Sequence, residues 1–500
     1  MATEHFDVLF VGAGISGIGG AYHIQKSLPG KSFAILEARS EIGGTWSLFR
    51  YPGIRSDVDM HTFGFGFKPW RDREAIADGD KILAYLNEAI DENGLRPHIR
   101  LNQRLTQASW SSKTARWTVT IDQSGIPSEI SCTFLYFGSG YYSYSEGHYP
   151  EFPDQDKFAG TIVKPQFWPE NLDYKGKKIV VIGSGATAIT IVPSIADDAA
   201  HVTMLQRSPT YVVPRPAQDK VANFLFKYMP DKIAYPMVRW RNILMGMYFF
   251  NLCKKQPDKV KTHILSMVRE VVGPDYDIAT HFTPSYKPWD QRMCVVRDGD
   301  MFRQIRSGKV SVVTDHIDRF TTHGIKTVSG IEIPADIIVS ATGLKAEIFS
   351  GVKLEVDGRV VLIPETIAYK GFMYSGIPNL VLVTGYSNAG WTLKADLISE
   401  YICRLIGHMD KTGSDYCVPD ATGVVASETP PFALESGYIM RALDRMPKQG
   451  TAEPWVANNN YFRDLMQVRY AKIDDGVIKF RKAAADDGAA NEPAMLVAAE

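Results

Sequence analysis

The chain has 500 residues, of which 45% are hydrophobic and 22% are charged, and its formal net charge at pH 7 is −1. This length predicts two or three domains, and the balanced charge excludes the basic excess that is typical of nucleic-acid-binding proteins. The cysteines lack CxxC pairs and metal-ligand spacing, which argues against a disulfide framework, a metal site and a dithiol flavin reductase; they are Cys132, Cys253, Cys294, Cys403 and Cys417.

The N-terminal stretch predicts a dinucleotide-binding fold. The apolar run at residues 7–11 is typical of a buried parallel strand, and because it begins almost at once we expect no signal peptide and a cytoplasmic protein. Gly12, Gly14 and Gly17 follow with the spacing that permits a tight turn, close approach of a pyrophosphate and close helix packing. A helix over 15–27 would point its amides at the phosphates, and a strand over 32–36 would deliver Glu37 to a ribose hydroxyl.

The next segment, EIGGTWSLFRYPGIRSDVD at 41–59, has two open interpretations. Its paired glycines allow close backbone approach, Trp46 and Tyr51 offer flat faces to a ring system, and Arg55 and Asp57 supply opposite charges. It is therefore either a cofactor-binding loop or a surface loop with a buried tryptophan. Beyond it we expect a helix over 80–93 and a β-meander with strands over 99–105, 116–121 and 131–137, ending in GSGYY at 138–142.

A second dinucleotide signature begins with the strand 178–182. Gly183, Gly185 and Ala188 occupy the glycine positions, a helix runs to about residue 195, and a strand over 201–205 ends in Gln206, Arg207 and Ser208 instead of an acid. Glu37 would repel a 2′-phosphate, whereas Arg207 would bind one, so the first site is expected to take FAD and the second NADPH. An arginine on a solvated strand end is the alternative.

Between residues 217 and 273 the pattern is helical, with segments at 221–229, 238–253 and 262–272. Tyr248, Phe249 and Phe250 belong to an apolar stretch that is too short to span a bilayer. It is a packed helix, a substrate-facing wall or a membrane-touching surface, and core packing is the interpretation we favour. Arg292 lies in an aromatic and apolar setting, so it must be paired or lie in a wet cavity.

These elements predict an α/β protein with two Rossmann-like dinucleotide-binding domains and a helical insertion. A buried strand over 337–340, followed by ATG at 341–343, is expected to return the chain to the first domain, and a helix after 385–396 should run through residue 405. The expected FAD-binding domain is 1–150 with 336–482, the NADPH-binding domain 151–215 with 286–335, the helical insert 216–285 and the disordered tail 483–500.

The sequence resembles the FAD- and NADPH-dependent Baeyer–Villiger monooxygenases, relatives of the flavin-containing monooxygenases, and within them the ethionamide-activating group. The resemblance extends to about residue 476 and rests on GAGISG, GGTW, RYPGIRSD, GSGATA, QRSPTY, PWDQR, DIIVSATG and GYSNAGWTLKAD. The connector pattern FxGxxxHxxxWP of the family is matched by Phe158, Gly160, Trp168 and Pro169, but Lys164 stands at the histidine position. Gln291 stands where many relatives carry a lysine, which implies that Arg207 carries much of the 2′-phosphate recognition alone.

The resemblance also implies the site residues. Arg292 would be the catalytic arginine with Asp57 as its partner. The FAD site would be formed by Gly12, Gly14, Ser16, Gly17, Glu37, Gly44, Thr45, Trp46, Leu48, Arg55, Asp57 and Leu105. The NADPH site would be formed by Lys164, Gly183, Ser184, Gly185, Ala186, Thr187, Ala188, Arg207 and Ser208.

The activity that the resemblance implies is a monooxygenation. NADPH would reduce FAD, O2 would add at the flavin C4a, and the peroxide, kept deprotonated by Arg292, would convert a small apolar ketone to an ester or lactone or oxidise a thioether. Two alternatives stay open: a flavin monooxygenase restricted to S- and N-oxidation, and an uncoupled NADPH oxidase or redox sensor, which Lys164 makes conceivable. The Trp168–Pro169 ending of the connector favours the Baeyer–Villiger branch.

Overall fold

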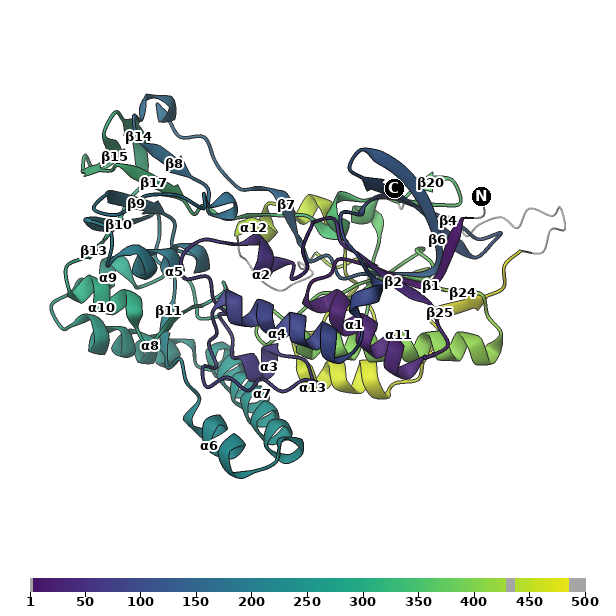
Figure 1. The fold of residues 1–500 in the computed structure, drawn as a ribbon. Helices are drawn as coiled ribbons and strands as arrows, with labels where there is room; N and C mark the ends of the chain where they lie inside the picture. Colours follow the sequence, from purple (N-terminus) through teal and green to yellow (C-terminus); the bar gives the residue numbers. More distant parts are fainter. Residues whose placement is uncertain (1–2, 429–436, 485–500) are drawn as a thin grey trace.

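Two sheets, one for each glycine signature, form the frame of the molecule and lie at opposite ends of an elongated shape (Figure 1). The structure is a computed structural model that describes residues 3–428 and 437–484. The expected disordered tail therefore lies outside the described residues from position 485 onward. Two Rossmann-like units were predicted from the sequence, and this fold class is confirmed.

The first sheet has nine strands in the order β20-β19-β4-β5-β6-β1-β2-β3, with β23 also paired to β6. The expected strands at 7–11 and 32–36 and the helix at 15–27 are present, because an apolar strand buried on both faces pairs in parallel on each side. The bounds are β1 Glu4–Val11, α1 Ile15–Ser27, β2 Phe33–Leu36, β3 Ile99–Arg100, β4 Arg104–Ser111, β5 Arg116–Gln123, β6 Ile126–Phe137, β19 Lys353–Val356, β20 Arg359–Val360 and β23 Leu380–Leu382.

The single strand expected over 99–105 is wrong. The chain forms two strands there, β3 and β4, because Asn102 adopts a left-handed backbone with φ of 57° and turns the chain between them. The β-meander itself is present as the antiparallel run β4-β5-β6.

The second sheet has five strands in the order β13-β10-β9-β17-β8, all parallel. The strand expected to return the chain to the first domain, Ile337–Ser340, is β17 of this sheet instead, and that expectation is wrong. Its four buried residues pair with β9 and β8, so re-entry begins only at β18, which pairs with β7. The bounds are β8 Thr161–Val163, β9 Lys178–Ile182, α5 Ala186–Ile195, β10 His201–Gln206, β13 Val310–Thr314, β7 Tyr142–Gly147 and β18 Leu344–Ala346. The other domain limits stay predictions.

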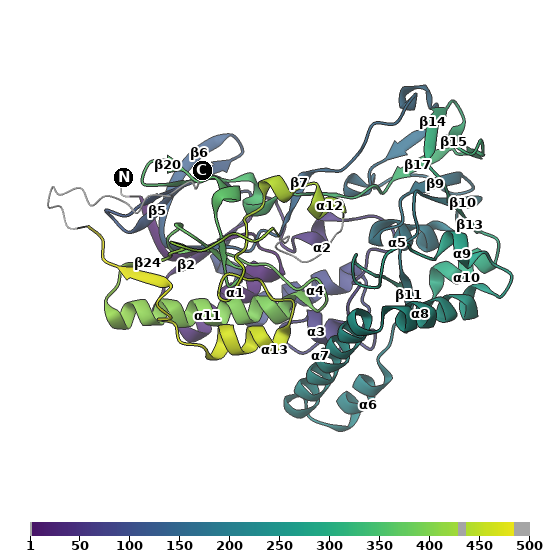
Figure 2. The same ribbon diagram turned by 180° about the vertical axis from the view of Figure 1, so that it is seen from behind.

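The expected helical insertion is present, and two of its helices project from the body of the molecule (Figures 1 and 2). These are α6 Lys220–Tyr228 and α7 Asp231–Lys255, followed by α8 Pro257–Val272 and α9 Ile278–His281. Core packing was favoured for residues 248–250, but Tyr248 is 70% exposed, because the buried face of α7 lies on other residues. Among the described residues, no helix is both long and apolar enough to cross a bilayer.

The remaining elements complete the first unit and the connections. The expected helix after residue 385 is α11 Trp391–Thr412, which packs against α1. The others are α2 Thr45–Leu48, α3 Met60–Phe63, α4 Gly79–Glu92, α10 Asp300–Arg306, α12 Gly437–Met440, α13 Tyr461–Asp464, β11 Val212–Arg215, β12 Cys294–Arg297, β14 Ile317–Thr321, β15 Gly324–Thr327, β16 Glu332–Pro334, β21 Ala368–Tyr369, β22 Met373–Tyr374, β24 Tyr416–Pro419 and β25 Ile478–Arg481.

Candidate functional site

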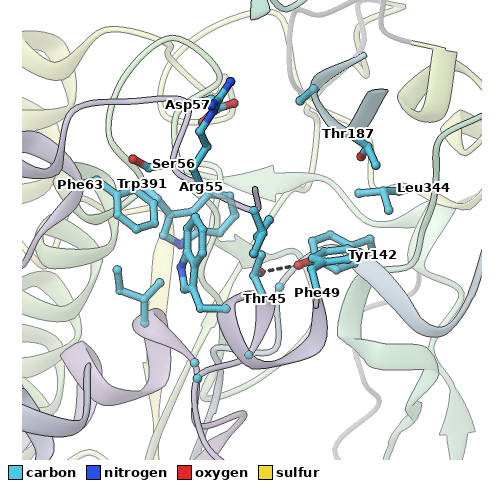
Figure 3. A pocket seen from close by; sticks show the side chains of 18 of the residues that line it. Thr45, Phe49, Arg55, Ser56, Asp57, Phe63, Tyr142, Thr187, Leu344 and Trp391 are labelled. Carbon is cyan, nitrogen blue, oxygen red and sulfur yellow. Dashed lines mark hydrogen bonds between the residues drawn. The ribbon is translucent and has the colours of Figure 1, made fainter. Parts of the chain in front are cut away.

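A cavity of about 260 Å³ lies where the two units meet, and both glycine signatures contribute to its wall (Figure 3). Gly14 and Ser16 line it from the start of α1, and Ala186 and Thr187 from the start of α5. In Figure 3, Arg55, Asp57 and Trp391 stand on one side of this space and Thr187 and Leu344 on the other. Six further predicted residues line it: Gly44, Thr45, Trp46, Arg55, Asp57 and Arg292.

The first signature is built by close backbone packing. A methyl group on Gly17 would lie 1.9 Å from the carbonyl oxygen of Gly12, so only glycine fits there, and the Gly12 amide donates to the Leu36 carbonyl. Glu37 is 6% exposed, and its two carboxylate oxygens accept hydrogen bonds from the amides of Ala13 (2.8 Å) and Arg39 (3.0 Å). Burial raises the pKa of Glu37.

Leu105 does not line this cavity; it is buried against the first sheet. Its strand nevertheless begins beside the acid, because the Gln103 amide donates to the Glu37 carbonyl oxygen at 2.9 Å. The backbone contact to an adenine ring that we expect from this strand stays a prediction.

The second signature has the same strand–turn–helix architecture, but its second strand is followed by Arg207 instead of an acid. Gly183 has a φ of 130°, which favours glycine, and a methyl group on it would lie 2.3 Å from the Ala341 carbonyl oxygen. The Ser184 hydroxyl donates to the Ser208 carbonyl at 3.2 Å, so the turn is tied to the end of β10. Gly185 caps α5, Ala188 is buried beneath it, and Arg207 is exposed.

A second arginine lies near Arg207, and sequence reasoning missed it. Arg441 follows α12, and its Nη2 would be 3.5 Å from a methyl group on Gly343, which ends the segment after β17. Partial loss of hydration, and then the positive charge of Arg207, lower the pKa of Arg441. No carboxylate of the described residues is within ion-pair distance of either arginine. In the sequence, only a motif at 437–441 could have predicted that Arg441 lies near Arg207.

The loop at 43–58 connects the two units. Its Thr45 side chain contacts the Tyr142 hydroxyl (Figure 3), and its Tyr51 lines the cavity together with Thr187 of the second signature. Arg55, which is 8% exposed, donates from Nη1 to Asp300 at 2.5 Å. Asp300 belongs to α10, so this predicted FAD-site residue is held by the second unit.

Two further contacts join elements around the site. The Trp391 indole donates to the Ser16 hydroxyl at 2.7 Å, which joins the start of α11 to the first signature. Leu48 ends α2 and packs on the core beneath the second sheet. The sequence carries no local signal for the Asp300 or Trp391 contacts, because they join residues hundreds of positions apart.

Arg292 and Asp57 form an ion pair, with Nη2 of the arginine 2.6 Å from Oδ2 of the aspartate. The Asp57 carboxylate raises the pKa of Arg292. Both side chains line the cavity between the signatures and also two neighbouring cavities of about 450 and 90 Å³. The pair therefore lies between three neighbouring cavities, and Asp57 holds the guanidinium group of Arg292 in place.

The larger neighbouring cavity is mostly apolar. Residues of α7 form one wall, including Ile243, Met245 and Tyr248, and the segment 387–390 forms another. Met267, Trp289 and Met293 close its remaining side. This space suits an apolar small molecule, and Arg292 is among the residues that line it.

Lys164 does not line any of these three cavities. It is exposed, and its Nζ lies 4.9 Å from the centre of the Tyr149 ring. Its expected contact with a nicotinamide dinucleotide stays a prediction.

The residues fit two dinucleotides on structural grounds. Each helix after a glycine turn leaves its first amides without helical partners, and such ends bind phosphate groups. Trp46, Tyr141 and Tyr142 give the cavity between them apolar ring faces. The chain thus provides phosphate-binding turns at both ends and an aromatic wall in the middle.

Comparison with known proteins gives consistent results. Residues 11–77 match the family described as NAD(P)-binding Rossmann-like domain, and residues 60–350 match the family described as flavin-binding monooxygenase-like. The chain is 51% identical over 487 residues to the FAD-containing monooxygenase EthA of Mycobacterium tuberculosis, covering 97% of this chain and 100% of that protein. It is 46% identical over 482 residues to the probable FAD-binding monooxygenase AlmA of Acinetobacter baylyi, covering 96% and 97%.

Two solved structures share the fold. An oxidized steroid monooxygenase bound to NADP has a TM-score of 0.75 at 24% identity, covering 96% of this chain and 100% of that chain. A cyclohexanone monooxygenase bound to epsilon-caprolactone has a TM-score of 0.74 at 21% identity, with the same coverage. At these identities the likeness concerns the fold alone.

Proposed function

The chain belongs to the flavin-binding monooxygenase-like family, and from this premise we propose that it catalyses Baeyer–Villiger oxidation with FAD, NADPH and O2. A ketone, O2, NADPH and a proton would give an ester or lactone, NADP⁺ and water. One oxygen atom enters the substrate and the other leaves as water. Thioethers would be oxidised to sulfoxides with the same stoichiometry.

The observation that carries this proposal is the position of the Arg292–Asp57 pair. It faces the cavity between the two signatures on one side and the apolar cavity on the other. A substrate in the apolar cavity and a ring system between the signatures would therefore meet at the guanidinium group.

Bound flavin supplies the redox chemistry that activates O2. Arg292 supplies a fixed positive charge, because a guanidinium group keeps its proton at every accessible pH. A fixed cation stabilises the negative charge that develops on oxygen when it attacks a carbonyl carbon, and such stabilisation is a large term in catalysis. Asp57 holds the guanidinium in one orientation through the 2.6 Å contact.

NADPH would be recognised by two arginines. Arg207, at the carboxyl end of β10, takes the place where the adenosine ribose binds in this fold. Arg441, whose pKa is lowered in part by the nearby charge of Arg207, would supply a second cation in place of the lysine absent at Gln291. This arrangement supports preference for a 2′-phosphate over a free ribose hydroxyl.

The substrate we propose is a small apolar ketone or thioether, in keeping with the apolar walls of the larger cavity. We also propose a cytoplasmic location, since the five cysteines are all unpaired and buried, as is usual in reducing compartments.

One experiment separates the proposal from its alternatives. NADPH consumption and peroxide release are measured with no substrate, with an aliphatic ketone and with a thioether, and products are identified by mass spectrometry. We expect substrate-stimulated consumption and an ester. Sulfoxide without ester would indicate an enzyme restricted to heteroatom oxidation, and constant consumption with stoichiometric peroxide would indicate an NADPH oxidase.

A further inference from the structure

The projecting helices α6 and α7 carry an unusual number of exposed apolar side chains. Along α7, exposed apolar residues recur every three or four positions, which places them on one stripe of the helix. The opposite side of α7 is buried on α3 and the residues after it, and the Tyr235 hydroxyl donates to the Phe65 carbonyl oxygen at 2.6 Å. The exposed set is 38–70% accessible and consists of Val221, Phe224, Tyr228, Ile233, Met237, Trp240, Leu244, Met245 and Tyr248.

This apolar surface continues onto a neighbouring helical segment. The Trp240 ring lies 5.9 Å from the Phe462 ring, and Phe462, Met466 and Tyr470 are exposed at four-residue intervals along 461–470. In Figures 1 and 2, α6, α7 and α13 lie along the same side of the molecule. We call the exposed residues of 221–248 with these three the apolar face.

Basic residues outnumber acidic ones in the helices that carry most of the apolar face. Residues 220–255 contain five lysines and two arginines against a single acid, Asp231, in a chain whose net charge is −1. Asp231 is paired with Arg71, and the two arginines point inward to Asp396 and Asp219. Lys220, Lys227 and Lys232 are exposed, with no carboxylate of the described residues within ion-pair distance. An apolar partner with an anionic surface suits this face.

The apolar face also contains the entrance to the larger cavity. Met245 and Tyr248 are both exposed at the surface and part of the cavity wall, whose inner end is Arg292. An apolar molecule could therefore pass from a layer covering this face to the ion pair without crossing water.

We propose that the apolar face docks onto the interfacial region of an anionic lipid leaflet, and that the larger cavity takes its substrate from that leaflet. The second half rests on the proposed function; the docking does not. A second copy of the chain is the competing occupant, but a self-complementary contact would bring two lysine-rich surfaces together.

The test of docking uses the full chain and co-sedimentation with vesicles of phosphatidylcholine alone or mixed with phosphatidylglycerol. The parent should bind the mixed vesicles. The triple variant Phe224→Ser/Ile233→Ser/Leu244→Ser, which leaves the cavity wall intact, should bind at least about tenfold more weakly because it removes three large apolar groups. The control variant Val328→Ser/Val360→Ser/Leu362→Ser removes equally exposed residues elsewhere and should bind like the parent.

A second variant tests the contribution of the lysines to vesicle binding. Lys227→Gln/Lys232→Gln should weaken binding to the mixed vesicles roughly tenfold and leave binding to phosphatidylcholine alone unchanged. A parent that stays in solution with both vesicles overturns the docking, as does a triple variant that binds like the parent. A dimer that the triple variant dissociates, without vesicle binding, would identify a second copy as the occupant and overturn it too.

The substrate route is tested separately. A long-chain ketone embedded in the vesicles should be turned over at least about fivefold more slowly by the triple variant, while a dissolved short ketone should be turned over equally by both. Equal rates on the embedded ketone would overturn the route. If the parent binds vesicles but oxidises neither ketone, the proposed function fails and the docking stands.

Discussion

The two nucleotide-binding folds share a parallel topology and a glycine turn, but they hold their recognition side chains differently. Glu37 is buried and fixed by two backbone amides, whereas Arg207 is exposed and lies near a second arginine, Arg441. The difference suits a coenzyme that stays bound in the first fold and one that exchanges in the second. A buried acceptor is preorganised, while exposed cations attract an anion from solution.

The largest effect on activity is expected at Arg292, which lies between the two nucleotide-binding folds. Arg292→Ala should lower ester formation by about 10²–10³-fold, because it removes the fixed charge beside the developing anion. Flavin reduction by NADPH should be unchanged, since both signatures are intact. Rates of reduction and of ester formation are measured separately, with Arg297→Ala as the control, an arginine paired with Asp78. Ester formation at the parental rate would remove Arg292 from the mechanism.

The first fold is tested with Glu37→Gln. An amide offers only one acceptor oxygen, so one of the two buried N–H groups loses its partner at a cost of about 1–3 kcal/mol. We expect FAD to be retained about 10–100-fold less tightly, measured as the flavin released on dilution. Glu41→Gln, on a half-exposed acid paired with Arg50, should keep its FAD. Unchanged retention in the Glu37 variant would contradict the role we give to this buried acid.

The second fold is tested with Arg207→Ala, Arg441→Gln and the double variant. Loss of Arg207 should raise KM for NADPH about 10–100-fold and leave KM for NADH unchanged, because hydrogen bonds to charged groups contribute about 1.5–3 kcal/mol. Arg441→Gln should have a smaller effect that is not additive with the first, as expected for two cations on one phosphate. Arg306→Ala, an exposed arginine on α10, is the control. Additive effects would show that Arg441 acts elsewhere.

The smallest effect is expected at Lys164. If this lysine pairs with a phosphate of NADPH, Lys164→Ala should raise KM for NADPH up to about fivefold, the range of an exposed ion pair. KM for the organic substrate should not change. Lys175→Ala provides an exposed lysine for comparison. Equal changes in KM for NADPH and KM for the organic substrate would mean that Lys164 only packs on the Tyr149 ring.

The sequence could predict the two nucleotide-binding folds, but not the contacts between residues far apart in the chain. Each nucleotide fold is encoded locally, since strand, glycine turn and helix follow one another within about 30 residues, and both were predicted. The pairing of Arg292 with Asp57 came only from the family resemblance, because the two residues are 235 positions apart and share no local pattern. Arg441 was missed for the same reason.

Two predictions from the sequence were wrong because a local apolar pattern suits more than one environment. The run 337–340 is an apolar strand that suits either parallel sheet, so its sequence could not say which one it joins. Tyr248 was assigned to the core because α7 is apolar on both sides, and only the structure distinguishes its buried side from the exposed one.

The central claim is that the acid-ended fold holds FAD and the base-ended fold selects NADPH. The most direct measurement is the flavin absorbance of the purified, FAD-loaded protein when NADPH or NADH is added without oxygen. We expect yellow protein that NADPH bleaches at least about tenfold faster than NADH. Protein that retains no flavin, or flavin that the two coenzymes bleach at the same rate, would contradict it.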